Sequence, residues 1–104
     1  MKRTKRRYLA LQLECDGVPS ERELLDAIWA SVSKLFGEVG ASLTGLALIS
    51  LDTERKLAVL RCTLISLPSV RASVAALTKV AGKEASLHVL AVSGTLKALF
   101  STLN

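Results

Sequence analysis

Residues that carry redox or metal chemistry are scarce in this chain of 104 residues. It has two cysteines, Cys15 and Cys62, which lie far apart and form no C-x-x-C motif. This spacing predicts reduced, buried thiols in a cytosolic protein. The single histidine, His88, stands alone in an apolar run, and we interpret it as a core or surface residue. We therefore expect this chain to bind no metal or other cofactor itself.

The chain also lacks the patterns of an independent enzyme. It has no glycine-rich phosphate loop of the P-loop type and no meaningful Ser/His/Asp order. Three acids, Glu21, Glu23 and Asp26, fall in the first turns of a predicted helix, where they favour its dipole. Their position is explained without catalysis.

Long hydrophobic runs are absent. The longest uncharged stretch, residues 39–51, has 13 residues, fewer than the roughly 18 that would indicate a membrane span. Glu14 and Asp16 interrupt the apolar segment behind the basic N-terminus, which excludes a signal peptide. We expect a cytoplasmic protein with no membrane partner, or a nuclear one if the source is a eukaryote.

Positive charge is concentrated at the start of the chain. Five of the 14 basic residues fall within residues 1–7, and the other nine balance the nine acidic residues. The net charge of +5 thus belongs to a short arm. Such an arm is a common handle for nucleic acid, and a solvated terminus that improves solubility is the alternative. The basic residues of the arm are Lys2, Arg3, Lys5, Arg6 and Arg7.

Hydrophobic periodicity predicts four strands and three helices in one domain, residues 8–104, behind an arm of residues 1–7. The order is β-α-β-β-α-β followed by a C-terminal helix. This order predicts an α+β fold, a ferredoxin-like or RRM-like sandwich with a four-stranded antiparallel sheet. The predicted strands cover residues 7–15, 45–51, 57–64 and 87–92, and the predicted helices begin near Ser20, Pro68 and Ser93, the second of them stopping at Gly82.

The first predicted helix has a clear start. Ser20 and Glu23 form the S-x-x-E capping box. Trp29 and Phe36 fall on its wide apolar stripe, so we expect both in the core beneath the sheet. On that interpretation, Trp29→Ala would cost about 3–5 kcal/mol of stability.

The predicted sheet is apolar on both faces. An antiparallel sheet with one face in water alternates more clearly than residues 46–49, 59–60 and 89–90 do. We therefore expect the second face to be covered, in part by the last helix and for the rest by a protein partner or a second copy.

Two features outside the arm suggest anion or RNA contact. The stretch Ser93-Gly94-Thr95 leads from a strand into a helix that carries Lys97, which is a possible phosphate site or an ordinary capped helix start. Arg61 lies in an apolar strand, either as a surface arginine or as a contact to RNA or a partner acid. Base stacking on the sheet is not expected, because the third strand has no aromatic residue and Tyr8 alone is a weak platform.

Several segments together resemble one family, the archaeal ribonuclease P protein component 2, the counterpart of the small Pop-five subunit of eukaryotic ribonuclease P and MRP. The resemblance spans residues 7 to about 99. The hairpin turn departs from the pattern, since relatives often carry glycine where this chain has Lys56. The segments are Arg7-Tyr8-Leu9-Ala10, Ala27-Ile28-Trp29, Phe36-Gly37-Glu38-Val39-Gly40-Ala41, Leu60-Arg61-Cys62, Val70-Arg71 and Val92-Ser93-Gly94-Thr95-Leu96-Lys97.

The resemblance implies a non-catalytic subunit of ribonuclease P. In that family the RNA component holds magnesium and removes the 5′ leader from precursor tRNA. The protein pairs with a TIM-barrel subunit and self-associates into a dimer of heterodimers. The candidate RNA-binding residues are Lys2, Arg3, Lys5, Arg6, Arg7, Arg61, Arg71, Ser93, Gly94, Thr95 and Lys97.

Two alternatives remain open at this stage. A small-molecule-binding regulatory β-α-β-β-α-β module would place a ligand at a dimer interface, which accounts for the apolar sheet but not for the arm. A pure assembly protein would touch only its protein partner, and its arm could be deleted without effect on the particle.

Overall fold

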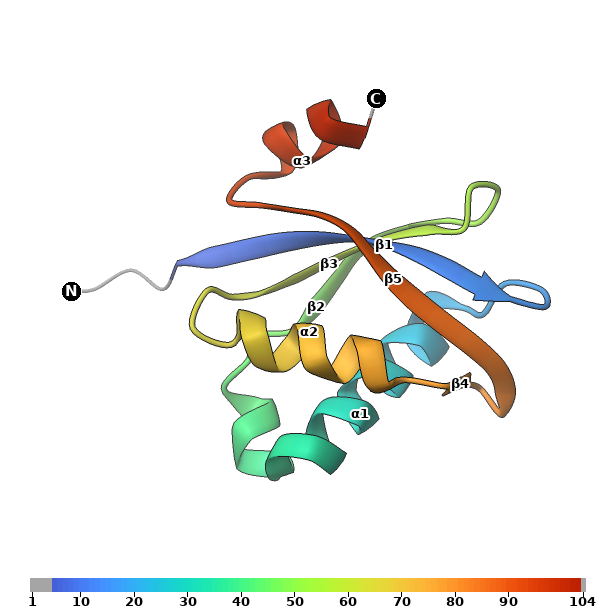
Figure 1. The fold of residues 1–104 in the computed structure, drawn as a ribbon, viewed down its shortest axis with the longest axis horizontal. Helices are drawn as coiled ribbons and strands as arrows, with labels where there is room; N and C mark the ends of the chain where they lie inside the picture. Colours follow the sequence, from blue (N-terminus) through green and yellow to red (C-terminus); the bar gives the residue numbers. More distant parts are fainter. Residues whose placement is uncertain (1–4, 104) are drawn as a thin grey trace.

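Five strands form a single antiparallel sheet between two helical layers. The computed structural model describes residues 5–103, apart from the side chain of Ser42. Helices α1 and α2 lie on one side of the sheet and α3 lies on the other (Figure 1). The elements are β1 (Arg6–Cys15), α1 (Glu21–Ser42), β2 (Ala47–Asp52), β3 (Leu57–Thr63), α2 (Leu67–Ala76), β4 (Lys79–Val80), β5 (Lys83–Ser93) and α3 (Leu96–Leu103).

The strand order is β2-β3-β1-β5-β4. β1 lies in the centre and pairs antiparallel with both β3 and β5. The predicted α+β sandwich is therefore confirmed, but the prediction of four strands was wrong by one. The additional strand, β4, is two residues long and pairs with the start of β5.

A tight turn explains this additional strand. Ala81 and Gly82 both have positive φ, at 53° and 79°, as a two-residue type I′ hairpin requires. The sequence pattern had placed Ala81 in a helix that stopped at Gly82. Instead α2 ends at Ala76, and the apolar spacing continues because Leu77 and Val80 also contact the core.

The main core lies between the sheet and the first helical layer. Alternate residues of β1 point into it, as the sequence predicted, and β3, β4, β5 and the two helices also contribute to it. Its largest fully buried side chains are Leu9, Leu11, Leu13, Leu24, Ile28, Leu60, Val32, Val70 and Val74.

A second, smaller core lies under α3. Leu99 is fully buried there against Ala10, Leu57 and Val59 on the other face of the sheet. Tyr8 also packs against this cluster. The last helix therefore covers part of the second face, as the apolar sheet pattern predicted (Figure 1).

Helix α1 begins as predicted and bends near its end. Ser20 Oγ accepts a hydrogen bond from the Glu23 amide at 3.1 Å, and the Glu23 carboxylate accepts one from the Ser20 amide at 2.9 Å. Gly37, with φ 79°, interrupts the helical backbone, and the chain then resumes helical geometry to Ser42.

Two aromatic residues of α1 are less buried than the sequence predicted. Trp29 and Phe36 are 40% and 44% exposed, so their assignment to the core was wrong. The apolar stripe is wider than the surface that the sheet can cover, and only its inner residues, such as Ile28 and Val32, are fully buried.

The β2–β3 turn has a backbone conformation at Lys56 that suits glycine. Lys56 has φ 52°, a left-handed conformation that glycine adopts without strain. Its carbonyl accepts a hydrogen bond from the Leu13 amide at 2.8 Å, and its Nζ donates to the Cys15 carbonyl at 2.8 Å. These contacts tie the turn to the end of β1.

Candidate nucleic-acid interface

Basic residues from distant parts of the chain meet at one end of the sheet. Arg6 opens β1 opposite Thr63, the last residue of β3. Arg7 follows it and Arg61 lies two residues before Thr63. We call this end of the sheet, defined by Arg6, Arg7 and Arg61, the basic end.

One cross-strand row organises the basic end. Tyr8 lies opposite Arg61 on β3 and opposite Ser93 on β5. Directly opposed residues of paired strands share a face of the sheet, with Cβ atoms about 4.5–5.5 Å apart. These three side chains therefore lie on the α3 side, and we call them the Tyr8 row.

Arg61 is partly buried within this row. Its Nε atom is fully covered and has no hydrogen-bond partner among the described residues. A buried donor without a partner is uncommon in folded proteins and calls for an explanation.

Arg7 and Gly94 lie close together. A methyl group at Gly94 would be 3.4 Å from Arg7 Nη1, an ordinary contact distance, so glycine is not required there for space. The same Nη1 donates to the Arg6 carbonyl at 2.9 Å. The start of β1 and the end of β5 thus present their polar groups side by side.

The start of α3 differs from the sequence prediction in its cap. Ser93 ends β5, and Thr95 caps the helix, because the Ala98 amide donates to Thr95 Oγ1 at 3.1 Å. Ser93 Oγ accepts a 3.4 Å hydrogen bond from the Thr95 amide. Lys97 is exposed one position into the helix.

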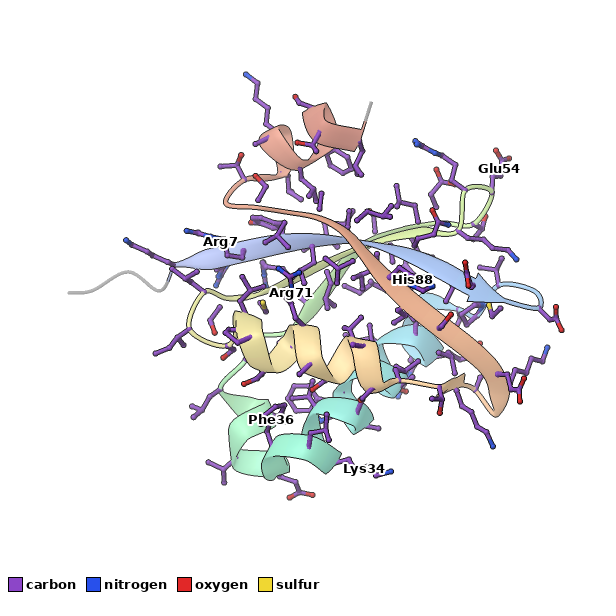
Figure 2. The ribbon with its side chains drawn as sticks, in the orientation of Figure 1. Arg7, Lys34, Phe36, Glu54, Arg71 and His88 are labelled. Carbon is purple, nitrogen blue, oxygen red and sulfur yellow. The ribbon has the colours of Figure 1, made fainter. Side chains whose placement is uncertain are left out.

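The remaining candidates are more dispersed. Lys5 is exposed, and its carbonyl accepts a hydrogen bond from the Leu64 amide at 2.8 Å. Arg71 is exposed on α2, in the opposite helical layer (Figure 2). Lys2 and Arg3 lie outside the described residues. Because β1 begins at Arg6, the last two residues of the proposed arm belong to the sheet.

Acidic residues of the sheet lie at its other end. Figure 2 shows Arg7 and Glu54 at opposite ends of the molecule. Glu14 is six residues along β1 from Tyr8, and Asp52 is five residues along β2 from the Ala47 that pairs with Arg61. At about 3.3 Å per residue these separations approach 17–20 Å, beyond the Debye length of about 8 Å at physiological salt. The charge at the basic end is therefore not neutralised by these acids.

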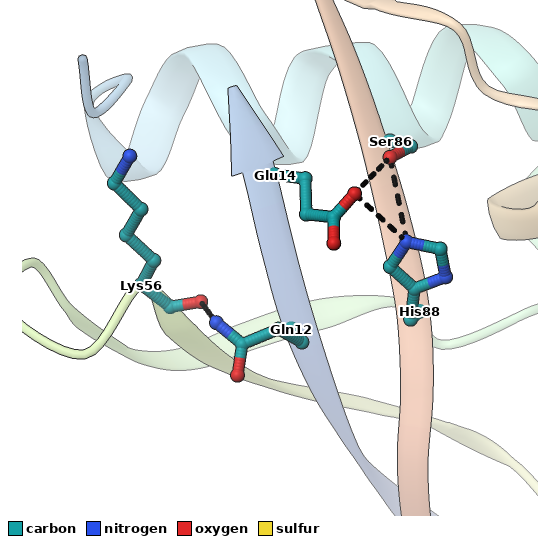
Figure 3. A network of polar contacts seen from close by, with 5 residues as sticks. All are labelled: Gln12, Glu14, Lys56, Ser86 and His88. Carbon is teal, nitrogen blue, oxygen red and sulfur yellow. Dashed lines mark hydrogen bonds and ion pairs between the residues drawn. The ribbon is translucent and has the colours of Figure 1, made fainter. Parts of the chain in front are cut away.

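A polar network occupies the acidic end of the second face (Figure 3). Glu14 Oε2 lies 3.3 Å from His88 Nε2 and 3.4 Å from Ser86 Oγ, which in turn lies 3.5 Å from the same histidine nitrogen. A catalytic triad needs the acid and the nucleophile on opposite ring nitrogens. This network therefore has the geometry of an exposed cross-strand contact.

The cysteines are both free. Burial raises the pKa of Cys62 from 9.0 to about 11, so it remains a thiol at neutral pH. Cys15 is partly exposed, and its Sγ donates to the Gly17 carbonyl at 3.0 Å.

Within residues 5–103, no three His, Cys, Asp or Glu side chains are grouped to hold a metal ion. No helix of this part of the chain is long and apolar enough to cross a membrane.

Sequence reasoning named all three arginines of the basic end but judged Tyr8 a weak stacking platform. The register between β1, β3 and β5 places it between Arg61 and Ser93, and no local sequence signal carries that information. Its position on the face opposite Leu9 was visible from the alternation of β1.

The fold and this site define a ferredoxin-like sandwich with one basic end. Comparison with known proteins makes the assignment specific: residues 7–103 match the Rpp14/Pop5 family. The chain belongs to this family.

Two relatives illustrate the match. The ribonuclease P protein component 2 of Methanosarcina mazei is 36% identical over 95 residues, 91% of this chain and 80% of the relative. The protein of that name from Pyrococcus horikoshii is 31% identical over 97 residues, 93% and 81% of the two chains. A chain of yeast ribonuclease MRP has the same fold, with a TM-score of 0.73 and 11% identity over 99% of this chain and 94% of that one.

Proposed function

We propose that this chain is a protein subunit of ribonuclease P that supports a catalytic RNA in removing the 5′ leader from precursor tRNA. The observation that carries the proposal is the basic end, on a chain whose curated relatives are named ribonuclease P protein component 2. Phosphates of an RNA backbone are the natural partners of such a site. In this proposal the chain acts by binding, and magnesium is held by the RNA.

A protein partner is part of the same proposal. Exposed apolar side chains lie on α1, at the residue that follows it and on the loop after β3, and such patches mark interaction surfaces. We propose that they serve a TIM-barrel subunit and a second copy of this chain, in a cytoplasmic particle. The exposed residues are Trp29, Leu35, Phe36, Leu43 and Ile65.

The salt dependence of RNA binding tests the RNA contact. We expect replacement of Lys2, Arg3 and Lys5 by glutamine to weaken binding to a ribonuclease P RNA. The slope of log affinity against log salt should fall by about 0.7–0.9 for each phosphate that the variant no longer binds. Substitution is preferable to deletion of residues 2–7, because deletion would shorten β1.

A matched control has the same change in net charge at the other end of the molecule. Replacement of the exposed Arg55, Lys79 and Lys83 by glutamine should leave the slope nearly unchanged. Equal decreases in slope for the two triple variants would show that binding follows net charge alone. An unchanged slope in the first variant would remove the arm from the RNA surface.

A further inference from the structure

The Tyr8 row places three chemical groups side by side across three strands: an aromatic ring, a guanidinium group and a hydroxyl. The RNA contact proposed for the arm involves none of them. We propose that this row binds one unstacked nucleotide of a single-stranded RNA segment, with the base on Tyr8 and the phosphate at Arg61. The inference rests on the proposed function and names the form of RNA that the site takes.

Arg61 is prepared for an anion. Its Nε is covered and lacks a partner among the described residues, and the acids of the neighbouring strands lie far along the sheet. A guanidinium group binds phosphate through paired, charge-assisted hydrogen bonds. The Nε atom itself is covered, so in this proposal the phosphate binds the accessible Nη atoms of the partly buried Arg61 side chain.

Tyr8 supplies a surface for the base. It packs against the Leu99 cluster and remains partly exposed, so its position is held while part of it faces solvent. Stacking on an aromatic ring is the usual way in which proteins hold unpaired bases. The single tyrosine that looked too weak as a platform acquires a cationic neighbour through the strand register.

The surroundings favour a nucleic acid with unpaired bases, because further cations lie close to the row and a base must be unpaired to stack on Tyr8. Arg6 precedes Tyr8 on the same face of β1, and the exposed Lys5 comes directly before Arg6. A strand held at Arg61 can therefore continue along further cations. Helix α3 lies on the same side of the sheet as the row (Figure 1), and Tyr8 packs against the Leu99 cluster under this helix.

A fluorine label on the ring tests this proposal directly. The chain has one tyrosine, so 3-fluorotyrosine gives the full-length protein a single ¹⁹F resonance, at Tyr8. We expect this resonance to shift and saturate with a single-stranded oligouridine of about eight nucleotides. A duplex RNA of equal length should leave it nearly unchanged.

Substitutions separate the base contact from the phosphate contact. Tyr8→Leu should lower the affinity for the single strand by about 5- to 150-fold without changing its salt slope, since one stacked base contributes about 1–3 kcal/mol. Arg61→Gln should reduce the salt slope by about 0.7. Arg55→Gln removes the same charge at the opposite end and should do neither.

Binding of the RNA without any shift of the Tyr8 resonance would overturn the row as a nucleotide site and leave the proposed function intact. A shift that appears only when the TIM-barrel partner is added would also overturn it, because protein would then cover the row. Absence of any binding to single-stranded RNA or to ribonuclease P RNA would overturn the RNA contact as a whole.

Discussion

At the scale of single residues, burial separates Ile28 from its neighbour Trp29 on α1. Ile28 is fully buried, whereas Trp29 is 40% exposed. Ile28→Ala should cost about 2–5 kcal/mol of unfolding free energy, because it removes packed methyl groups and leaves a cavity. Trp29→Ala should cost less than half as much, because much of the Trp29 ring faces solvent and its removal leaves a smaller cavity. Urea denaturation of both variants at equal m-value measures the difference, and equal costs would place Trp29 in the core.

Cys62 gives the stability a dependence on alkaline pH. Burial raises its pKa from 9.0 to about 11, so between these values the unfolded chain has released a proton that the folded chain retains. The stability that this difference in pKa contributes is fully present below pH 9. It is lost as the pH rises toward about 11, by up to about 3 kcal/mol of unfolding free energy.

Comparison of the wild type with Cys62→Val isolates this effect from other alkaline titrations. The wild type should lose more unfolding free energy than the variant between pH 8 and pH 10.5. Equal decreases would mean that the Cys62 thiol ionises as freely in the folded chain as in the unfolded one.

At the scale of elements, the β4–β5 hairpin has one residue that fits its turn poorly. Ala81 has φ 53°, a conformation in which asparagine is far more common than alanine. Ala81→Asn creates the preferred Asn-Gly type I′ turn and should raise the unfolding free energy by about 0.5–1 kcal/mol. Ala81→Val, with a branched side chain, should lower it. Thermal melting of the two variants checks both signs, and a lower stability of Ala81→Asn would contradict the turn assignment.

Elements with a local signal were predictable from the sequence. The alternation of β1, the capping box of Ser20 and Glu23, and the apolar second face under α3 are each encoded within a few residues. The strand β4 was not predictable, because Leu77 and Val80 continue the helical spacing of α2 while they contact the core from a hairpin. The exposure of Trp29 depends on how much of α1 the sheet covers, which periodicity does not specify.

The candidate site shows the same division. The arginines of the basic end, Ser93 and Gly94 were named as candidate residues. Their meeting depends on the register between segments about 53 and about 85 residues apart in the chain. Tyr8 was undervalued for this reason. The helix cap is Thr95, two residues after the predicted Ser93, because Ser93 still belongs to β5.

At the scale of the whole molecule, the Tyr8 row and the part of the proposed protein surface on α1 lie on different sides, whereas Ile65 lines the same surface hollow as Lys5. The Tyr8 row faces the α3 side of the sheet, whereas Phe36 lies on α1 in the opposite layer (Figure 2). An RNA and a protein partner can therefore bind at the same time. This arrangement suits a subunit that joins a larger ribonucleoprotein.

The most direct test of this account is cleavage of a precursor-tRNA leader by an archaeal ribonuclease P RNA at moderate magnesium. The RNA and its TIM-barrel protein partner are assayed with and without this chain. The account predicts that the cleavage rate rises when the chain is added and that the Lys2, Arg3 and Lys5 glutamine variant supports less of this increase. An identical rate with and without the chain would contradict its role as a ribonuclease P subunit.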